Sequence, residues 1–217
     1  FEWDIIDKTL RPNPDITYVK WDCNRYITQP GSSYLQPADQ SHLWIDYNRA
    51  LYRLMDRFAK GFPNVMAMLC AGGSGRVDYG AMPYFHSFWP SDNTDPLGRI
   101  KIQWGFSHFF PANTISAHVT RMGKRHLKMA IDVALSGAFG IDLALDKATA
   151  EERAQIADAV KLYKERIRPL VMHGELYRLV SPYESPLASL SYVSTDKQKA
   201  VVYFYQTKDG NEPRVML

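Results

Sequence analysis

Short apolar stretches alternate with longer helix-like stretches over the first 172 residues, and this alternation limits the possible fold more than any other feature of the chain. The short stretches are rich in β-branched and aromatic residues, as buried strands are, and cover residues 16–19, 65–69, 84–89, 115–119 and 138–143. The longer stretches cover residues 1–10, 42–60, 94–104, 124–135 and 149–172. Such an alternation predicts an α/β fold with parallel strands.

Local signals mark the ends of two predicted helices. The helix at 42–60 is amphipathic and is followed by Gly61-Phe62-Pro63, which ends it. The helix at 149–172 begins with a capping box formed by Thr149 and Glu152. From Gly174 the pattern changes, and polar turns separate strand-like stretches at residues 177–179, 188–193 and 200–206. The sequence therefore predicts an antiparallel sheet after the last helix.

The composition is that of an ordinary globular protein and excludes several classes. Hydrophobic residues make up 46% of the 217 residues and charged residues 23%. A net charge of +3 without a basic run argues against nucleic acid as a partner, and no apolar run reaches the roughly 20 residues of a membrane span. The six His show no metal-ligand spacing, so we expect no metal. We expect Cys23 and Cys70, which follow different strands, to be free thiols.

Charged residues arrive together at the end of the first predicted strand. Lys20 and Asp22 lie two residues apart, so on a strand they share one face, where the ammonium favours the ionised carboxylate. Chemistry in α/β folds lies at the carboxyl ends of strands, and an ionised carboxylate there suits a nucleophile. Taken alone, these two residues favour a structural salt bridge at a strand end over a nucleophile.

A second carboxylate, Asp92, lies 70 residues after Asp22 and also follows a predicted strand. This separation is about two βα units, and two carboxylates placed in this way are what a retaining glycosidase needs. We expect the two carboxyl groups to lie about 5–6 Å apart in a retaining enzyme and roughly 9 Å apart in an inverting one. The structural alternative for Asp92 is a helix N-cap. Asp95 is the competing candidate for the acid, although it is more simply a helix residue paired with Arg99.

Three motifs resemble those of glycoside hydrolase family 36, which contains the large α-galactosidases. They are Lys20-Trp21-Asp22-Cys23-Asn24-Arg25, Cys70-Ala71-Gly72-Gly73-Ser74-Gly75-Arg76-Val77-Asp78 and Ser91-Asp92-Asn93-Thr94-Asp95. Weaker matches follow in the expected order: Gln103-Trp104-Gly105, Ala117-His118-Val119 and Gly174-Glu175-Leu176-Tyr177-Arg178-Leu179. The resemblance covers nearly the whole chain. The sequence departs from the family at Cys23, commonly Met, at Ala71, commonly Ser, and before Cys70, where Met68 and Leu69 replace a common polar residue.

The resemblance implies how the domains are arranged. Residues 1–172 would form about the last five units of a (β/α)8 TIM barrel, and residues 173–217 the start of a C-terminal antiparallel β domain. An N-terminal β-sandwich and the first three barrel strands would then lie outside this chain. We therefore expect the chain to be a piece of a longer protein, with the remainder as its partner.

The resemblance also implies roles for individual residues. Asp22 would be the nucleophile and Asp92 the acid/base, while the sugar would contact Lys20, Asn24, Cys70, Gly72, Gly73 and Trp89. Structural alternatives stay open for several of these, because an Asn or a Gly is common in turns and a Trp is common in cores. We take His118 as structural and expect Tyr34, Trp44 and Trp104 to be buried, with contacts to the aglycone as the alternative.

The implied function is retaining hydrolysis of terminal α-D-galactose from melibiose- or raffinose-type oligosaccharides, with no cofactor. Three alternatives stay open: a galactosyltransferase, an α-N-acetylgalactosaminidase, and an inactive carbohydrate-binding protein. The expected partners are the oligosaccharide and the rest of the same protein, with neither nucleic acid nor membrane. The family implies a possible homo-oligomer, and we expect a soluble protein of the cytoplasm or periplasm.

Overall fold

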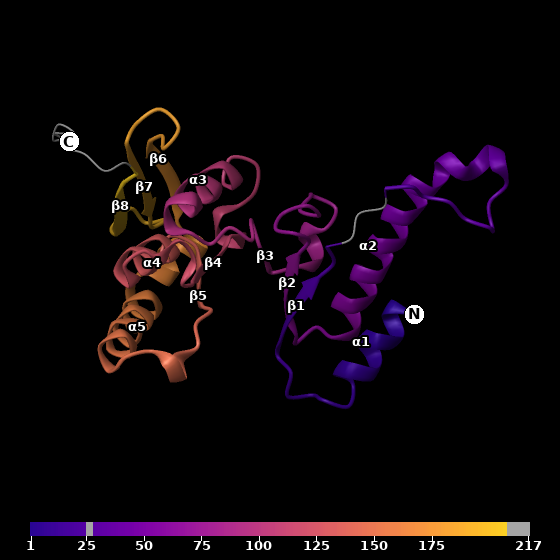
Figure 1. Cartoon of the computed structure of the whole chain (residues 1–217), viewed down its shortest axis with the longest axis horizontal. Coiled ribbons are helices and arrows are strands. Elements are labelled where there is room, and N and C mark those ends of the chain that lie inside the picture. Colours follow the sequence, from indigo (N-terminus) through magenta and orange to yellow (C-terminus); the bar gives the residue numbers. More distant parts are fainter. Residues whose placement is uncertain (25–27, 208–217) are drawn as a thin grey trace. The chain divides into compact units, whose positions relative to one another are not determined.

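A computed structural model of the chain describes residues 1–24 and 28–207. The chain divides into two compact units, Phe1–Trp89 and Pro90–Leu217 (Figure 1). Both contain parallel strands, and the second ends in an antiparallel sheet. The predicted α/β class and the change to antiparallel strands are therefore confirmed. The last ten residues of the predicted segment 173–217 lie outside the described part.

The first unit is a three-stranded parallel sheet with two helices. Its elements are α1 (Glu2–Leu10), β1 (Tyr18–Asp22), a 3₁₀ helix at Pro37–His42, α2 (Leu43–Gly61), β2 (Met66–Cys70), a 3₁₀ turn at Met82–Tyr84 and β3 (Ser87–Phe88). The strand order is β1-β2-β3, and Asp22 pairs in register with Cys70. The sheet therefore brings the first two motifs of the sequence side by side.

Two strand predictions for this unit need correction. β1 begins at Tyr18 and is only half-buried, because it is an edge strand that pairs with β2 alone. The third predicted strand shrinks to Ser87–Phe88 because residues 82–84 form a 3₁₀ turn with Pro83 near its start. Proline fixes its own φ and cannot donate to a sheet ladder, so it favours the turn.

Aromatic packing fixes which face of β1 carries the charged residues. The Trp21 ring meets Phe58 of α2 edge-on at 5.5 Å between centroids and Phe85 at 5.8 Å. Successive residues of a strand point to opposite faces, so Lys20 and Asp22 lie on the face away from α2.

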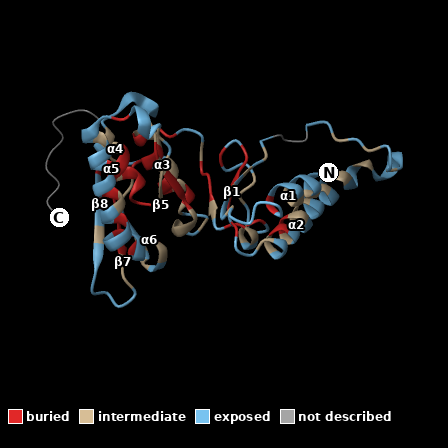
Figure 2. Ribbon diagram, turned by 90° about the horizontal axis from the view of Figure 1, so that it is seen from below, coloured by how far each residue is buried: buried red, intermediate tan, exposed pale blue. Residues whose placement is uncertain are grey.

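The second unit contains two parallel strands, their helices and a three-stranded meander. Its elements are α3 (Pro96–Phe106), β4 (Ser116–Val119), α4 (Leu127–Ala134), β5 (Ala138–Ile141), α5 (Ala150–Leu162), a π-helical turn at Tyr163–Ile167, α6 (Arg168–His173), β6 (Glu175–Val180), β7 (Leu187–Val193) and β8 (Ala200–Gln206). β4 pairs parallel with β5, and β6, β7 and β8 pair antiparallel in chain order. The buried residues of this unit form a core cluster to which α3, β4, α4 and β7 contribute, whereas the residues of β5 are all of intermediate burial (Figure 2).

The predicted helix at 149–172 begins as expected but is not continuous. Thr149 and Glu152 form the capping box in both directions. The π-helical turn then precedes Pro169, which lies in the first turn of α6. Proline has no N–H for the preceding turn, which interrupts the α-helical hydrogen bonds at this point.

Four buried tyrosines connect the meander and the π-helical turn to the end of α4. From the meander, the Tyr192 hydroxyl donates to the Ser136 carbonyl, that of Tyr203 to the Leu135 carbonyl and that of Tyr205 to the Asp132 carbonyl. From the π-helical turn, the Tyr163 hydroxyl donates to the Gly137 carbonyl. The four distances are 2.8 to 3.3 Å. The last carbonyls of a helix have no partner within it, and here the tyrosines supply donors. The tight turn also needs a glycine, since a Cβ on Gly137 would lie 2.9 Å from the Ile115 carbonyl oxygen.

Within the described ranges, no helix has the length and hydropathy needed to cross a membrane.

Candidate functional site

The carboxyl end of β1 carries the first group of predicted site residues. Lys20 Nζ lies 3.6 Å from Asp22 Oδ2, so the predicted ion pair on one face of the strand is confirmed. Both side chains remain 41% exposed, which leaves the carboxylate accessible. The Lys20 ammonium also lies 5.2 Å from the centroid of the Trp89 ring, a cation–π distance. Lys20 is thus held between a carboxylate and an aromatic face.

Cys70 lies beside Asp22 on the neighbouring strand and is 1% exposed. Burial raises the pKa of the Cys70 thiol, and its hydrogen bond with the Asp22 side chain raises it further. The thiol is therefore protonated at neutral pH and acts as a weak hydrogen-bond donor rather than as a nucleophile. Together with Met68 and Trp89 it forms a small buried cluster in the first unit. Both cysteines are free thiols, as predicted.

The glycine loop after β2 is tied to the loop after β1. The Gly72 N–H donates to the side-chain oxygen of Asn24, and Ala71 N–H donates to the Gly73 carbonyl. Gly72 and Gly73 have φ values of +59° and +85°, a region that favours glycine. We expected the backbone N–H groups of this loop to face a sugar hydroxyl, but that of Gly72 already donates to Asn24.

Arg76 strengthens the same connection between the two loops. Its Nε donates to the Cys23 carbonyl over 3.0 Å, and its guanidinium lies 5.6 Å from the centroid of the Tyr47 ring. The loops after β1 and β2 are therefore cross-linked by one side-chain amide and one guanidinium, neither of which the sequence identified as a link.

A hollow of about 1040 Å³ follows β1 in the first unit. Its walls include α1 residues, Tyr47 and Phe58 of α2, and the consecutive run from Val19 to Asn24. Because residues from both faces of β1 line it, the hollow runs along the edge of the strand that has no partner in the described sheet. Asp22, Lys20 and Asn24 all border this space.

Trp89 is 4% exposed in its unit and packs beneath Lys20. This burial favours the structural alternative over sugar stacking. Of the other aromatic residues that we expected to be buried, Trp104 is buried, but Tyr34 is 96% exposed and Trp44 is 47% exposed. The prediction was wrong for both because Tyr34 lies in the loop before the 3₁₀ helix Pro37–His42 and Trp44 lies in the first turn of α2, where the described chain offers little to cover them.

Asp92 lies in the second unit, in the segment that leads into α3, and its side chain is exposed. The N-cap of α3 is Asp95, whose carboxylate accepts from Gly98 N–H and lies 3.5 Å from Arg125 Nε. The capping alternative for Asp92 is therefore wrong, and so is the predicted pairing of Asp95 with Arg99.

Arg99 instead connects the backbone of the motif to the backbone of β4. It is 2% exposed and donates to the Ser91 carbonyl over 3.2 Å and to the Ser116 carbonyl. Burial lowers the pKa of Arg99 to about 10, so the guanidinium stays charged at neutral pH. The sequence reasoning missed this role, and the spacing of eight residues from Ser91 is its only signal.

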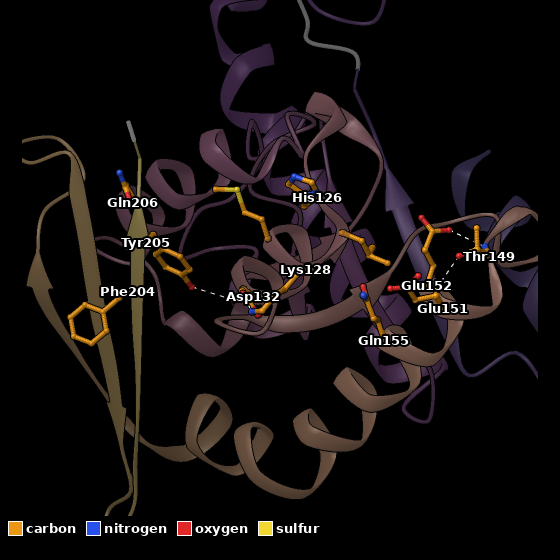
Figure 3. Close-up of a pocket in the computed structure, with 12 residues that line it drawn as sticks. His126, Lys128, Asp132, Thr149, Glu151, Glu152, Gln155, Phe204, Tyr205 and Gln206 are labelled. Carbon is orange, nitrogen blue, oxygen red and sulfur yellow. Dashed lines mark hydrogen bonds and ion pairs between the residues drawn. The ribbon is translucent and has the colours of Figure 1, made fainter. Parts of the chain in front are cut away.

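The second unit has a separate hollow of about 740 Å³ beside β8 (Figure 3). The N-terminal parts of α4 and α5 and residues Phe204, Tyr205 and Gln206 line it, and Asp92 is not among its lining residues. Figure 3 shows the Tyr205 hydroxyl directed at Asp132 and Glu152 at Thr149. Over residues 1–24 and 28–207, no three His, Cys, Asp or Glu side chains come together as metal ligands would.

The family model described as Melibiase matches residues 2–174, most of the chain. The chain belongs to the melibiase family. Among curated relatives, it is 40% identical to alpha-galactosidase AgaA of Geobacillus stearothermophilus over 97% of its own length and 30% of that protein. It is 34% identical to alpha-galactosidase 1 of Pediococcus pentosaceus, again over 97% of the chain, and 29% of that protein is covered.

Solved structures of melibiase relatives share the fold of this chain. The crystal structure of AgaA matches it with a TM-score of 0.91 at 39% identity, covering 97% of this chain and 30% of AgaA. The alpha-galactosidase from Lactobacillus brevis gives a TM-score of 0.91 at 33% identity, covering 99% of this chain and 29% of that protein. A variant of AgaA has been solved in complex with raffinose and matches with a TM-score of 0.88. This melibiase chain thus spans about 30% of the length of the relatives that it matches.

Proposed function

We propose that this chain carries the catalytic residues of a retaining α-galactosidase. The observation that carries the proposal is the accessible Asp22 carboxylate at the end of β1, paired with Lys20 and bordered by the Cys70 thiol, in a chain of the melibiase family. A carboxylate held at a strand end by an ammonium, with its outer side open, suits attack on an anomeric carbon.

We propose that the parallel strands are the fourth to eighth strands of a (β/α)8 barrel. The unpartnered edge of β1 and the hollow along it fit a further strand there, because an edge strand presents unpaired N–H and C=O groups. The first strands would come from the rest of the same polypeptide, which agrees with the fraction of the relatives that this chain spans. Residues from 173 onward would begin the C-terminal β domain.

In the proposed reaction, the Asp22 carboxylate attacks the anomeric carbon while Asp92 gives its proton to the leaving-group oxygen, and the glycosidic bond breaks. Water then attacks the anomeric carbon of the galactosyl-enzyme and gives a proton to Asp92, which releases galactose and frees Asp22. Lys20 balances the charge of Asp22 before attack. The protonated Cys70 thiol and Asn24 would contact sugar hydroxyls.

The proposed substrates are oligosaccharides with a terminal α-galactose. The raffinose complex of the related AgaA supports this substrate class. An N-acetyl group would need space beside Cys70 and Gly72, and both are held tightly, by burial and by the bond to Asn24. This crowding favours galactose over its N-acetylated analogue.

The test compares Asp22→Gly and Asp92→Gly in the full-length polypeptide with an activated aryl α-galactoside and azide. In Asp22→Gly, azide attacks the anomeric carbon directly, and the single inversion gives β-galactosyl azide. In Asp92→Gly, azide attacks the galactosyl-enzyme, and the second inversion gives α-galactosyl azide. Asp146→Asn, at an exposed carboxylate outside the site, is the matched control and should keep full activity.

The products decide between the roles. Hydrolysis that survives in Asp22→Gly without azide would refute the nucleophile, and identical azide anomers from both variants would refute the division of roles. Binding of galactosides without turnover by the unmodified protein would support the inactive carbohydrate-binding alternative.

A further inference from the structure

The segment that carries Asp92 is held from two sides within the second unit. On one side, Arg99 donates to the Ser91 carbonyl, directly before Asp92, and to the Ser116 carbonyl at the start of β4. The segment also binds itself, since Asn93 N–H donates to the Ser91 hydroxyl and Asp95 N–H to the Asn93 side chain. These hydrogen bonds restrict the conformations available to the backbone around Asp92.

The loop after β4, residues 120–125, holds the other side. The Thr120 hydroxyl donates to the Thr94 hydroxyl over 2.8 Å, and Thr94 N–H donates to the Met122 sulfur over 3.2 Å. Arg125 adds its ion pair with Asp95. Three side chains of this loop therefore contact the two residues that lie two and three positions after Asp92.

Gly123 shows how closely the loop approaches the segment. A Cβ at this position would lie 1.8 Å from Asp95 Oδ1, and the residue has φ +77°. Any side chain here would displace the carboxylate that caps α3 and pairs with Arg125. The Asp95 carboxylate cannot move away to make space for a side chain, because the Gly98 N–H binds one of its oxygens and Arg125 pairs with the other.

We propose that residues 120–125 form a positioning loop that, together with Arg99, fixes the direction of the Asp92 carboxyl for proton transfer. This inference rests on the proposed function, in which Asp92 is the acid/base. Arg99 acts through the Ser91 carbonyl before Asp92, and Thr120 and Gly123 act through the side chains of Thr94 and Asp95 after it, so all three are positioning residues. A misplacement of about 1 Å in a catalytic group can cost roughly 100-fold in rate.

A misdirected proton donor has a kinetic signature that general loss of structure lacks. A sugar leaving group is basic and must receive a proton as the bond breaks, whereas an aryl leaving group of low pKa departs without one. Thr120→Val and Gly123→Ala should therefore lower kcat/KM about 10- to 100-fold for melibiose and leave kcat/KM for a dinitrophenyl galactoside nearly unchanged, because kcat/KM reports formation of the galactosyl-enzyme. For the dinitrophenyl galactoside, kcat and KM should fall together, because Asp92 also accepts the proton of the water that cleaves the galactosyl-enzyme.

Matched controls separate positioning from folding in the full-length polypeptide. Thr114→Val removes a hydroxyl that bonds only the local Pro111 carbonyl, and Gly31→Ala adds a Cβ where no atom lies within 4 Å. Both should retain kcat and kcat/KM on the two substrates. Thr120→Ser keeps the hydroxyl and should restore the kcat/KM for melibiose that Thr120→Val loses. Should Gly123→Ala fail to fold, the Thr120 pair alone carries the test.

Asp92→Gly sets the reference for these outcomes. If Asp92→Gly lowers kcat/KM equally for both substrates, the proposed acid/base role fails. If Asp92→Gly shows the leaving-group dependence but Thr120→Val matches Thr114→Val on both substrates, the positioning loop is refuted. An equal loss on both substrates in Thr120→Val would also refute it, because that result reports a structural role only.

Discussion

Removing a single tyrosine hydroxyl should loosen the end of α4. The Tyr192 hydroxyl donates to the Ser136 carbonyl over 2.8 Å and that of Tyr203 to the Leu135 carbonyl over 2.9 Å, and both side chains are buried. A Tyr→Phe substitution keeps the ring and leaves a buried carbonyl without its donor, which costs about 1–2 kcal/mol. We expect local opening to become about 5- to 30-fold more frequent in each variant.

Hydrogen exchange of the full-length polypeptide, followed in peptides that cover residues 127–141, measures this opening. Tyr192→Phe and Tyr203→Phe should speed exchange there, and the double variant should exceed either single one. Tyr34→Phe, at a ring that is 96% exposed, is the control and should leave exchange unchanged. Unchanged exchange in both buried variants would refute the inference that these carbonyls depend on the tyrosine donors.

Two further predictions concern the stability that Glu152 contributes and the reactivity of the two thiols. The bonds from Arg121, and then from the Thr149 backbone, lower the pKa of Glu152 to about 2 from its usual 4.5, so its contribution to stability is complete above pH 4.5 and lost as the pH falls toward 2. The Tm difference between the unmodified protein and Glu152→Gln should shrink over that range, and a constant difference would contradict the linkage. Iodoacetamide at pH 8 should label Cys23 before Cys70, since Cys23 is half-buried and Cys70 is 1% exposed, although burial raises the pKa of both thiols. Equal labelling rates by mass spectrometry would show that β2 opens as readily as the loop after β1.

The order and type of the elements could be predicted because hydrophobic spacing reports burial directly. The exceptions arise from proline: Pro83 shortens β3, and Pro169 follows a π-helical turn in the long C-terminal helix. The half-buried state of β1 was not predictable either. The predicted stretch 16–19 has the composition of an interior strand, and only the sheet order shows that β1 has a partner on one side alone within the described residues.

The site could be predicted as far as side chains on one strand determine it. The ion pair of Lys20 with Asp22 follows from strand periodicity alone. The N-cap of α3 could not be predicted, because Asp92 and Asp95 both precede the helix and have equal capping propensity. The Asn24 bond to Gly72 joins residues 48 positions apart, so no local pattern contains it.

The anchoring of the meander on α4 also limits where relatives can be recombined. A chimera joined at residue 174 would bring a foreign sheet whose side chains have not been matched to the carbonyls after α4. Gly174 tightens the restriction, since a Cβ there would lie 2.5 Å from the Leu170 carbonyl oxygen and 2.6 Å from that of Val193. An exchange that transfers residues 127–141 together with β6, β7 and β8 keeps both halves of this contact, so the natural unit of exchange crosses the border between the parallel strands with their helices and the antiparallel sheet.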